Sequence, residues 1–207
     1  MKETFSVVGF LARSHGTNGL AHVIASERYH PACIFTHRLN PKSQDPGQAQ
    51  RGEYAEMESL CDIHRIPLHT IDSNKEAMKI DGILARSGKF DFMVSISWRR
   101  VIPVHQLRLP GIGGVNLHRG KLPDYKGAEP IKQALHNKDN FITITSHHLS
   151  EEIDSGETIA TCTHPVNFDT GCSMNTNITR LKRELTPHFG PLLIESMDSM
   201  VDRYESR

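Results

Sequence analysis

The amino-terminal half of the chain alternates short apolar runs with segments in which apolar residues recur at helical spacing. The apolar runs, which predict strands, are Phe5–Leu11, Ala32–Thr36, Pro67–Ile71 and Asp91–Ser97. The helical spacing, which predicts helices, is carried by Leu20, Val23 and Ile24, by Tyr54, Met57, Leu60 and Cys61, and by Glu76–Ser87. Gly88 is expected to end the last helix. This alternation predicts a parallel α/β sheet with right-handed crossovers.

Two segments of this half add detail to the predicted sheet. Residues 91–97 are apolar enough for a strand covered on both faces, so we expect this strand to be central. The polar segment Arg38–Gly52 contains two prolines and two glycines, which predicts an exposed loop.

The pattern changes after Pro110. The carboxyl-terminal half predicts strands at Gly113–Leu117, Phe141–Leu149 and Thr158–Val166, and a short helix at Pro130–Leu135. Apolar residues then recur at helical spacing over Met174–Tyr204. Pro187 and the pair Gly190-Pro191 interrupt this pattern, so a final helix broken near them is expected. The 207 residues are expected to form a single domain, 1–207.

Charge and composition narrow the possible partners. Lys plus Arg and Asp plus Glu are equal at 24 each, so no excess positive charge points to a nucleic acid or an acidic membrane. Every apolar stretch is too short to span a bilayer, and Met1-Lys2-Glu3-Thr4 resembles no secretory signal. A cytoplasmic location is therefore expected.

The residues that most often bind metals form no ligand pattern. The four cysteines, Cys33, Cys61, Cys162 and Cys172, lie far apart without a C-x-x-C pair, so we interpret them as reduced and mostly buried thiols. Thirteen histidines are present, but no H-E-x-x-H spacing occurs. No metal site is expected.

The most informative residues for chemistry are Asn116 and His118. They stand two apart on a predicted strand, so their side chains leave the same face. An amide donor and an imidazole that converge on one point suit acyl transfer, because they stabilise a developing oxyanion and move a proton. A distant carboxylate such as Asp154 would raise or hold the basicity of the histidine and keep the imidazole charged. The residue types alone also fit a strand cap, a surface histidine and a plain turn.

The spacing of these residues resembles a known family. The stretch Asn116-x-His118-x-x-x-Leu122-Pro123-x-x-x-Gly127, followed by Ile153-Asp154-x-Gly156, is similar to that of the folate-dependent formyltransferases. The resemblance implies a Rossmann-like fold with a mostly parallel twisted sheet and flanking helices. It also implies that Asn116, His118 and Asp154 are catalytic and that the cofactor is N10-formyltetrahydrofolate.

The same resemblance implies two walls of a folate pocket. One follows the fourth strand and contains Trp98, Arg99, Arg100, Val101 and Ile102. The second is formed by Glu151, Glu152 and Ile153. Trp98 is also compatible with a role as a core or interface anchor.

The substrate contacts are less well defined. Gly16-Thr17-Asn18 resembles in part a glycine-rich loop that holds a substrate phosphate, although helix N-capping by Thr17 or Asn18 also explains it. The candidate substrate contacts are Arg13, His15, Gly16, Thr17, Asn18, Lys121 and Lys126. The family usually has serine two residues after the histidine, where this chain has Gly120. We expect this departure to affect which substrate is bound more than the type of reaction catalysed.

The expected activity is formyl transfer from N10-formyltetrahydrofolate to the primary amine of a small metabolite, such as an amino sugar or glycinamide ribonucleotide. Two alternatives remain open, hydrolysis of N10-formyltetrahydrofolate and folate binding without catalysis. The expected partner is a small amine, with no nucleic acid and no membrane, and a homodimer is compatible with the sequence.

Overall fold

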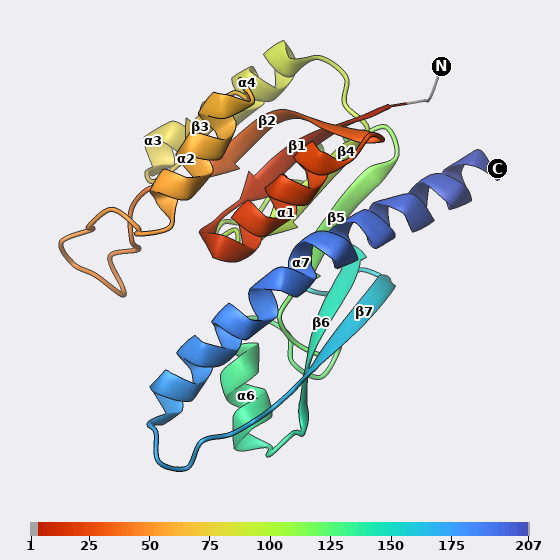
Figure 1. Ribbon diagram of the computed structural model, residues 1–207. Helices are drawn as coiled ribbons and strands as arrows, with labels where there is room; N and C mark the ends of the chain where they lie inside the picture. Colours follow the sequence, from red (N-terminus) through yellow and green to blue (C-terminus); the bar gives the residue numbers. More distant parts are fainter. Residues whose placement is uncertain (1–3, 207) are drawn as a thin grey trace.

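The computed structural model describes residues 4–206, so the expectation for residues 1–3 lies outside the described part of the chain. Its core is a seven-stranded sheet in the order β3-β2-β1-β4-β5-β6-β7 (Figure 1). The elements in chain order are β1 (Phe5–Leu11), α1 (Arg13–Ala25), β2 (Tyr29–Thr36), α2 (Tyr54–Ile63), β3 (Leu68–Thr70), α3 (Asn74–Ala77), α4 (Ile80–Ser87), β4 (Phe92–Ile96), α5 (Val104–Leu107), β5 (Gly113–His118), α6 (Pro130–His136), β6 (Phe141–His148), β7 (Thr158–Pro165) and α7 (Met174–Glu205).

The sheet is parallel from β3 to β5, and β6 and β7 continue it in antiparallel pairing. This confirms the expected α/β fold with a mostly parallel sheet. All five residues of β4 are buried, and β4 lies between β1 and β5, which confirms that this strand is central. Gly88 follows α4 with a φ of 76°, the backbone conformation that favours glycine at a helix end.

Helices cover both faces of the sheet and form two cores. Alternate residues of β1 divide between them, because successive side chains of a strand point to opposite faces. Val7 and Leu11 pack with α1, α2, α6 and α7, whereas Val8 and Phe10 pack with α4. Figure 1 shows α1 and α7 side by side across one face of the sheet, and residues of the two helices are in contact.

The final helix differs from the prediction. α7 runs without interruption from Met174 to Glu205, although Pro187 and Pro191 lie inside it. A proline within a helix costs about 3 kcal/mol, and burial of one large apolar side chain returns about 1.5–3 kcal/mol. Phe189, Leu192 and Leu193 are all buried at this point, so tertiary packing outweighs the local penalty.

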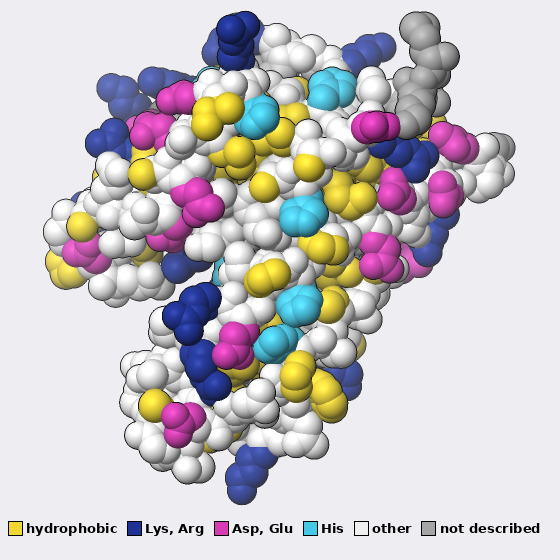
Figure 2. Space-filling view, viewed as in Figure 1, with side chains coloured by type: hydrophobic (Ala, Val, Ile, Leu, Met, Phe, Trp, Pro, Cys, Tyr) yellow, Lys and Arg dark blue, Asp and Glu magenta, His cyan; other side chains and the backbone are white. Residues whose placement is uncertain are grey.

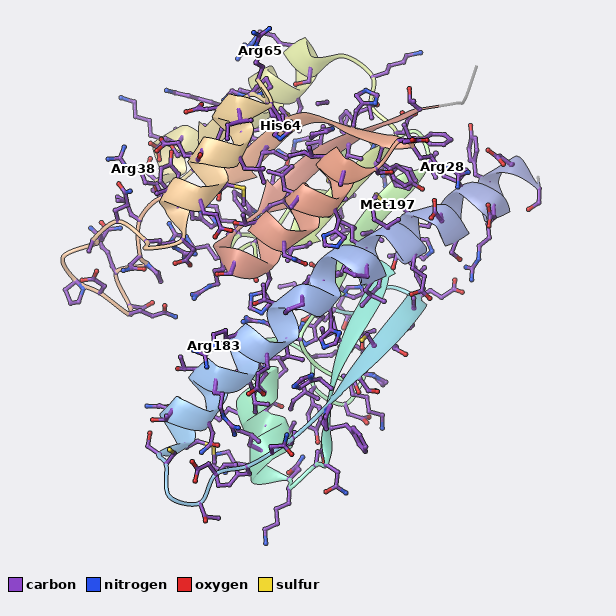
Figure 3. The ribbon with its side chains drawn as sticks, viewed as in Figure 1. Arg28, Arg38, His64, Arg65, Arg183 and Met197 are labelled. Atoms are coloured by element: carbon purple, nitrogen blue, oxygen red, sulfur yellow. The ribbon has the colours of Figure 1, made fainter. Side chains whose placement is uncertain are left out.

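Contacts with other elements hold α7 in place along its length. The Gly190 N–H donates to Asn18 Oδ1 at 2.8 Å, and a Cβ at Gly190 would clash with the His22 ring. Only glycine therefore permits this close approach to α1. Further along α7, Met197 is buried, and Arg28 Nη1 lies 2.8 Å from Asp198 Oδ1 (Figure 3).

The helix expected over residues 76–87 is two helices. It begins earlier, at Asn74, because Ser73 and Glu76 form a reciprocal capping box. A turn at residues 78–79 then separates α3 from α4. The short helix α5, which begins directly after Pro103, was not predicted. The loop over residues 38–52 is present as expected, although Arg51 within it is buried.

Residues 4–206 contain no helix that is both long and apolar enough to cross a membrane. Within the same range, no group of three or more His, Cys, Asp and Glu side chains is arranged to hold a metal ion. All four cysteines are free; Cys33 and Cys61 are buried, Cys162 is half-buried and Cys172 is exposed.

Candidate active site

A cleft of about 710 Å³ opens where β1, β4 and β5 end at their carboxyl termini. In parallel α/β sheets, ligands bind outside this edge, and the volume is in the range of small-molecule sites. The segments that follow the three strands meet here, together with loop residues 150–154 and one face of α7. Residues far apart in the sequence are thereby combined in one cavity.

The three predicted catalytic residues meet in this cleft. Asn116 and His118 leave the same face of β5, whereas Val115 and Leu117 point into the core on the other face. Asp154 lies against both: its Oδ2 is 3.3 Å from His118 Nδ1, and its Oδ1 is 3.4 Å from Asn116 Nδ2. His118 and Asp154 are buried, at 8% and 9% exposure, so this is an enclosed polar group.

Asp154 is held in position by its backbone and by a second hydrogen bond. Its φ is 52°, which is rare for a residue other than glycine, and its Oδ2 accepts a hydrogen bond from the Gly127 N–H at 2.9 Å. Burial alone would raise the pKa of Asp154. Hydrogen bonding to His147 and Gly127, with the proximity of His118, outweighs burial and lowers this pKa below its usual range, so the carboxyl is ionised.

His118 has a defined orientation. Its Nε2 lies 2.7 Å from the carbonyl oxygen of Tyr125, which only accepts, so Nε2 carries a hydrogen and Nδ1 faces Asp154. Burial lowers the pKa of His118 below its ordinary value, and the nearby Asp154 carboxylate offsets this only in part. The geometry nevertheless places an acceptor beside each ring nitrogen, the Tyr125 carbonyl at Nε2 and the Asp154 carboxylate at Nδ1. That Asp154 keeps the imidazole charged stays a prediction.

Strained backbone is concentrated around the cleft. Seven described residues other than glycine have a positive φ, and four of them line the cleft. These four are Arg13 at 61°, Ser97 at 55°, Glu129 at 57° and Asp154 at 52°. Such conformations cost about 1–3 kcal/mol each and persist where the surrounding structure fixes them, typically at functional sites.

The segment after β4 forms one apolar wall of the cleft. Trp98 stacks on His37 with ring centroids 4.1 Å apart and also lines the cleft, so it serves both as an anchor and as a wall. Val101 is 66% exposed and Ile153, from the opposite wall, is 60% exposed. Exposed apolar side chains on both walls provide surfaces for a flat aromatic ligand. The other residues predicted for these walls, Arg99, Arg100, Ile102, Glu151 and Glu152, also line the cleft.

The two arginines of this segment make contacts within the protein. Arg99 forms an ion pair with Asp72, Nη2 to Oδ1 at 2.9 Å, and Arg100 Nη1 donates to Asn74 Oδ1 at 3.0 Å. These contacts join the wall to the segment after β3. The Nε atom of Arg100 is buried and has no hydrogen-bond partner among the described residues.

Of the residues predicted to contact the substrate, the structure brings Arg13 into the cleft. Gly16, Thr17 and Asn18 lie inside α1, which begins at Arg13, so they form neither a loop nor a cap. The Thr17 hydroxyl donates to the Arg13 carbonyl, and Asn18 binds α7. Their polar groups are thus engaged in helix packing.

The other predicted contacts also lie outside the cleft lining. His15 is buried against Phe189, and burial, reinforced by nearby cations, lowers its pKa to about 3, so it carries no charge to offer an anion. Lys121 forms an ion pair with Asp124 at 2.8 Å, and Lys126 Nζ donates to Ser155 Oγ at 2.7 Å. These placements correct the expectation for His15 and give no support to the one for Lys121 and Lys126.

Sequence reasoning missed three cations that lie with Arg13 in the cleft. We refer to Arg13, Arg51, Arg119 and Lys182 as the cation cluster. Burial lowers the pKa of Arg51 and of Arg119 to about 10, and repulsion from Arg13 contributes to both shifts. The Nη1 atoms of Arg51 and Arg119 are buried without a hydrogen-bond partner, and within residues 4–206 no member of the cluster forms an ion pair.

Sequence reasoning also missed His147. It lies directly opposite Asn116 in the β5–β6 pairing, and its Nε2 is 2.9 Å from Asn116 Nδ2 and 3.5 Å from Asp154 Oδ1. We refer to Asn116, His118, His147 and Asp154 as the acid–base cluster. The sequence did contain a signal for this residue. Alternate side chains of a strand face the same side, and His147 lies at the end of a predicted strand shortly before Asp154.

Gly120 is required by the packing around His118. A Cβ at this position would lie 2.6 Å from Pro130 Cβ and 2.9 Å from both His118 Nε2 and the Tyr125 carbonyl oxygen. In this chain the Tyr125 carbonyl occupies the space beside His118 that a side chain at position 120 would need. The absence of a serine here is therefore linked to the way the imidazole is held.

A Rossmann-like sheet with a polar cluster at the carboxyl ends of β4 and β5 defines a class of α/β ligand-binding and catalytic domains. Within this class, the family model described as formyl transferase matches residues 55–187, which is more than half of the chain and includes Asn116, His118 and Asp154. The protein belongs to the formyl transferase family.

Two curated relatives illustrate the range of the family. The methionyl-tRNA formyltransferase of Bacteroides fragilis is 30% identical over 156 residues, which cover 75% of this chain and 45% of that protein. The mitochondrial formyltetrahydrofolate deformylase 1 of Arabidopsis thaliana is 33% identical over 110 residues, covering 53% of this chain and 34% of that protein. The chain thus aligns with between a third and a half of the length of these relatives.

Two crystal structures share the fold. Phosphoribosylglycinamide formyltransferase from Bacillus halodurans has a TM-score of 0.67 and 20% identity, with 93% of this chain and 94% of that chain covered. A formyltetrahydrofolate deformylase from Pseudomonas syringae has a TM-score of 0.72 and 20% identity, with 97% of this chain and 63% of that chain covered. At this level of identity, the likeness concerns the fold.

Proposed function

We propose that the protein transfers a formyl group from N10-formyltetrahydrofolate to the primary amine of a small metabolite that carries an anionic group. The observation that carries this proposal is the convergence of Asn116, His118 and Asp154 in one enclosed cleft. Membership of the formyl transferase family supports the same reading. We also propose that residues 1–207 form a single catalytic domain and that two copies of the protein form a homodimer.

The cleft suits a folate as donor. Its walls combine the indole of Trp98 with the exposed apolar side chains of Val101 and Ile153, which suit the faces of a flat ring system. Residues 98–102 and 150–154 line the same space, and we expect their backbone groups to contact the polar edge of a pterin. N10-formyltetrahydrofolate would supply the formyl group, whereas the protein supplies binding, orientation and proton transfer.

In the proposed reaction, the amine nitrogen attacks the formyl carbon, and the bond from that carbon to N10 then breaks. The Asn116 amide and the imidazole of His118 lie where the formyl oxygen gains negative charge. The pair of His118 and Asp154 takes up the proton that the amine loses, because Nδ1 of His118 lies 3.3 Å from Asp154 Oδ2 while Nε2 donates to the Tyr125 carbonyl. Asp154 stabilises the resulting imidazolium, and the proton finally reaches N10 of the leaving tetrahydrofolate.

The cation cluster indicates the type of acceptor. Buried guanidinium groups that repel one another and lack partners are costly, and binding an anion removes this cost. Lys182 lies in the amino-terminal half of α7 and lines the cleft. Figure 2 shows Lys and Arg side chains on the outer surface over this half, where the exposed Arg183 also lies. A phosphate or carboxylate on the acceptor would bind here and bring its amine toward His118.

Hydrolysis of N10-formyltetrahydrofolate is the second candidate function, because deformylases are among the relatives and structural neighbours. In that reaction water would take the place of the amine at the same three residues. A folate-binding protein without catalysis is the third alternative, and the intact acid–base cluster argues against it.

Turnover with a panel of amines distinguishes these functions. Purified protein is incubated with N10-formyltetrahydrofolate, first alone and then with phosphorylated amines, carboxylated amines and neutral amines. Formyl transfer predicts tetrahydrofolate release that depends on an anionic amine, together with a formylated product detected by mass spectrometry. Release of formate at full rate without any amine would support hydrolysis, and folate binding with no turnover would support the binding protein.

A further inference from the structure

His37 lies behind the wall of the cleft that residues 98–102 form. It follows β2 directly, is 2% exposed and does not itself line the cleft. In the sheet, β1 separates β2 from β4, so a side chain that follows β2 reaches the segment after β4 only by crossing the end of β1. His37 does so, because its ring stacks on that of Trp98 with centroids 4.1 Å apart and an interplanar angle of 14°.

Both ring nitrogens of His37 hold backbone groups. Nδ1 lies 2.7 Å from the carbonyl oxygen of Ile71, the residue after β3, and Nε2 lies 3.4 Å from the backbone nitrogen of Arg99. A carbonyl oxygen only accepts hydrogen bonds, so Nδ1 carries the hydrogen and Nε2 accepts the Arg99 N–H. Burial, reinforced by the charge of Arg99, lowers the pKa of His37 to about 3, so the ring is neutral and keeps this tautomer.

The wall needs support because the chain turns sharply just before it. Ser97 has a φ of 55°, a conformation that is costly for a residue other than glycine and persists where neighbouring contacts fix it. The next residue, Trp98, is contacted by the His37 ring and, in a T-shaped arrangement at 5.2 Å, by Phe10 of β1. Neither His37 nor Phe10 lines the cleft, so both leave the other side of the indole to a ligand.

The side chain of Arg99 extends the same connection. Its guanidinium donates to the Leu39 carbonyl oxygen at 3.0 Å and pairs with Asp72 at 2.9 Å. Asp72 in turn accepts the backbone N–H of Leu39 at 3.1 Å. The segments after β2, β3 and β4 are thereby joined, and His37 is the residue that contacts both the Trp98 ring and the Arg99 backbone.

We propose that His37 is a positioning residue for the formyl donor, because its contacts with Trp98 and with the Arg99 N–H keep this wall where the ring system of the donor packs against it. The inference rests on the proposed function for the identity of the donor. A wall that is already fixed binds its ligand without the entropic cost of ordering it. His37 therefore acts on the affinity for the donor and not on proton transfer.

Binding is measured without turnover, because Trp98 is the single tryptophan of the chain and its fluorescence reports on this wall. N10-formyltetrahydrofolate is titrated into wild type, His37→Leu and His37→Gln, and quenching gives the Kd. Leucine removes the stacking and the hydrogen bonds, whereas glutamine retains a donor and an acceptor. We expect the Kd to rise about tenfold in His37→Leu and about threefold in His37→Gln. The emission of Trp98 in His37→Leu should shift to longer wavelength.

His69→Leu is the matched control, because His69 also packs on an aromatic ring, that of Phe35, but lies on β3 outside the cleft lining. It should bind the donor as wild type does. In steady-state kinetics, His37→Leu should raise the KM of the donor while kcat and the KM of the acceptor change less than about threefold. An unchanged Kd, or an equal loss in kcat and in both KM values, would overturn the proposal. If His37→Leu does not fold, His37→Gln and His69→Gln give the same comparison.

These measurements separate this inference from the proposed function. Wild type that binds the donor but transfers no formyl group would reject formyl transfer, and a weaker Kd in the His37 variants would still support the positioning role. Formyl transfer by wild type with the same Kd in every variant would retain the function and reject the role of His37. A wild type that does not bind the donor would reject both.

Discussion

The acid–base cluster and the cation cluster lie in the same cleft but satisfy their polar groups in opposite ways. Within the acid–base cluster, Asp154, His118 and His147 contact one another or the backbone, so charge and hydrogen bonds are balanced inside the protein. Arg51 and Arg119 of the cation cluster keep buried N–H groups without partners and are repelled by Arg13. The contrast indicates that the acid–base cluster satisfies its polar groups within the protein, whereas the cation cluster requires an anionic ligand to satisfy its N–H groups.

Loss of the acid–base cluster should have the largest effect. We expect His118→Ala to lower kcat by about 1000-fold or more, because it removes the base and one group beside the oxyanion. The control is His105→Ala, since His105 is exposed and lies outside the cleft lining. Stopped-flow measurement of tetrahydrofolate release provides the rate, and circular dichroism checks the fold. Near-normal turnover in His118→Ala would break the assignment of this cluster.

The orientation of His118 is tested by Gly120→Ala. The new Cβ would meet Pro130, His118 and the Tyr125 carbonyl at under 3 Å, so the imidazole must move. We expect a loss in kcat of about 10- to 100-fold and a destabilisation of about 1–3 kcal/mol, measured by urea unfolding. Gly52→Ala is the matched control, because a Cβ there meets nothing within 4 Å. Equal behaviour of the two variants would show that His118 is not held by this packing.

The cation cluster is tested by Lys182→Met and Arg119→Met. If the cluster binds the anionic group of the acceptor, the KM of the acceptor should rise about 10- to 100-fold, while the KM of the folate changes little. Arg183→Met is the matched control for Lys182, because Arg183 is the next residue of α7 and its side chain is exposed (Figure 3). A rise in the KM of the folate alone would assign the cluster to the donor instead.

The same cations should also make the protein sensitive to acid through His15. Burial and the nearby cations lower the pKa of folded His15 to about 3, from the ordinary value of 6.5. Because the unfolded chain binds a proton at His15 more readily than the folded protein does, the free energy of unfolding is highest above pH 6.5 and decreases as pH falls toward 3. At pH 5 the loss is about 2 kcal/mol.

His15→Gln removes the titrating group, so urea unfolding at pH 8 and pH 5 should show a smaller loss of stability than in the wild type. His37 is also buried with its pKa lowered to about 3, but after burial the largest contribution to that shift comes from Arg99, which lies outside the cation cluster. His37→Gln therefore serves as the comparison. An identical loss in wild type and His15→Gln would contradict the pKa shift of His15.

Strand parity and the formyltransferase-like spacing were sufficient to predict that Asn116, His118 and Asp154 lie together. The apolar pattern was sufficient to predict the main strands along the chain. The cations were harder to predict, because Arg51 lies in a polar loop and Lys182 is on a helix more than sixty residues after His118 in the sequence. Their proximity depends on tertiary packing. The same limitation explains α7, where Pro187 and Pro191 predicted a break that burial against α1 prevents. The close contacts around a glycine such as Gly120 also depend on tertiary structure, because they involve residues that the fold brings next to it.

The unbroken α7 joins the cleft to the far end of the sheet. Its prolines leave the carbonyls of Arg183 and Pro187 without the amide donors four residues later, and the helix nevertheless continues to Glu205. Beyond this point, the Arg28–Asp198 ion pair ties α7 to the segment before β2. Lys182 in the cleft and Asp198 in this ion pair therefore belong to one continuous helix, so the packing of α7 against α1 also determines where the cation lies.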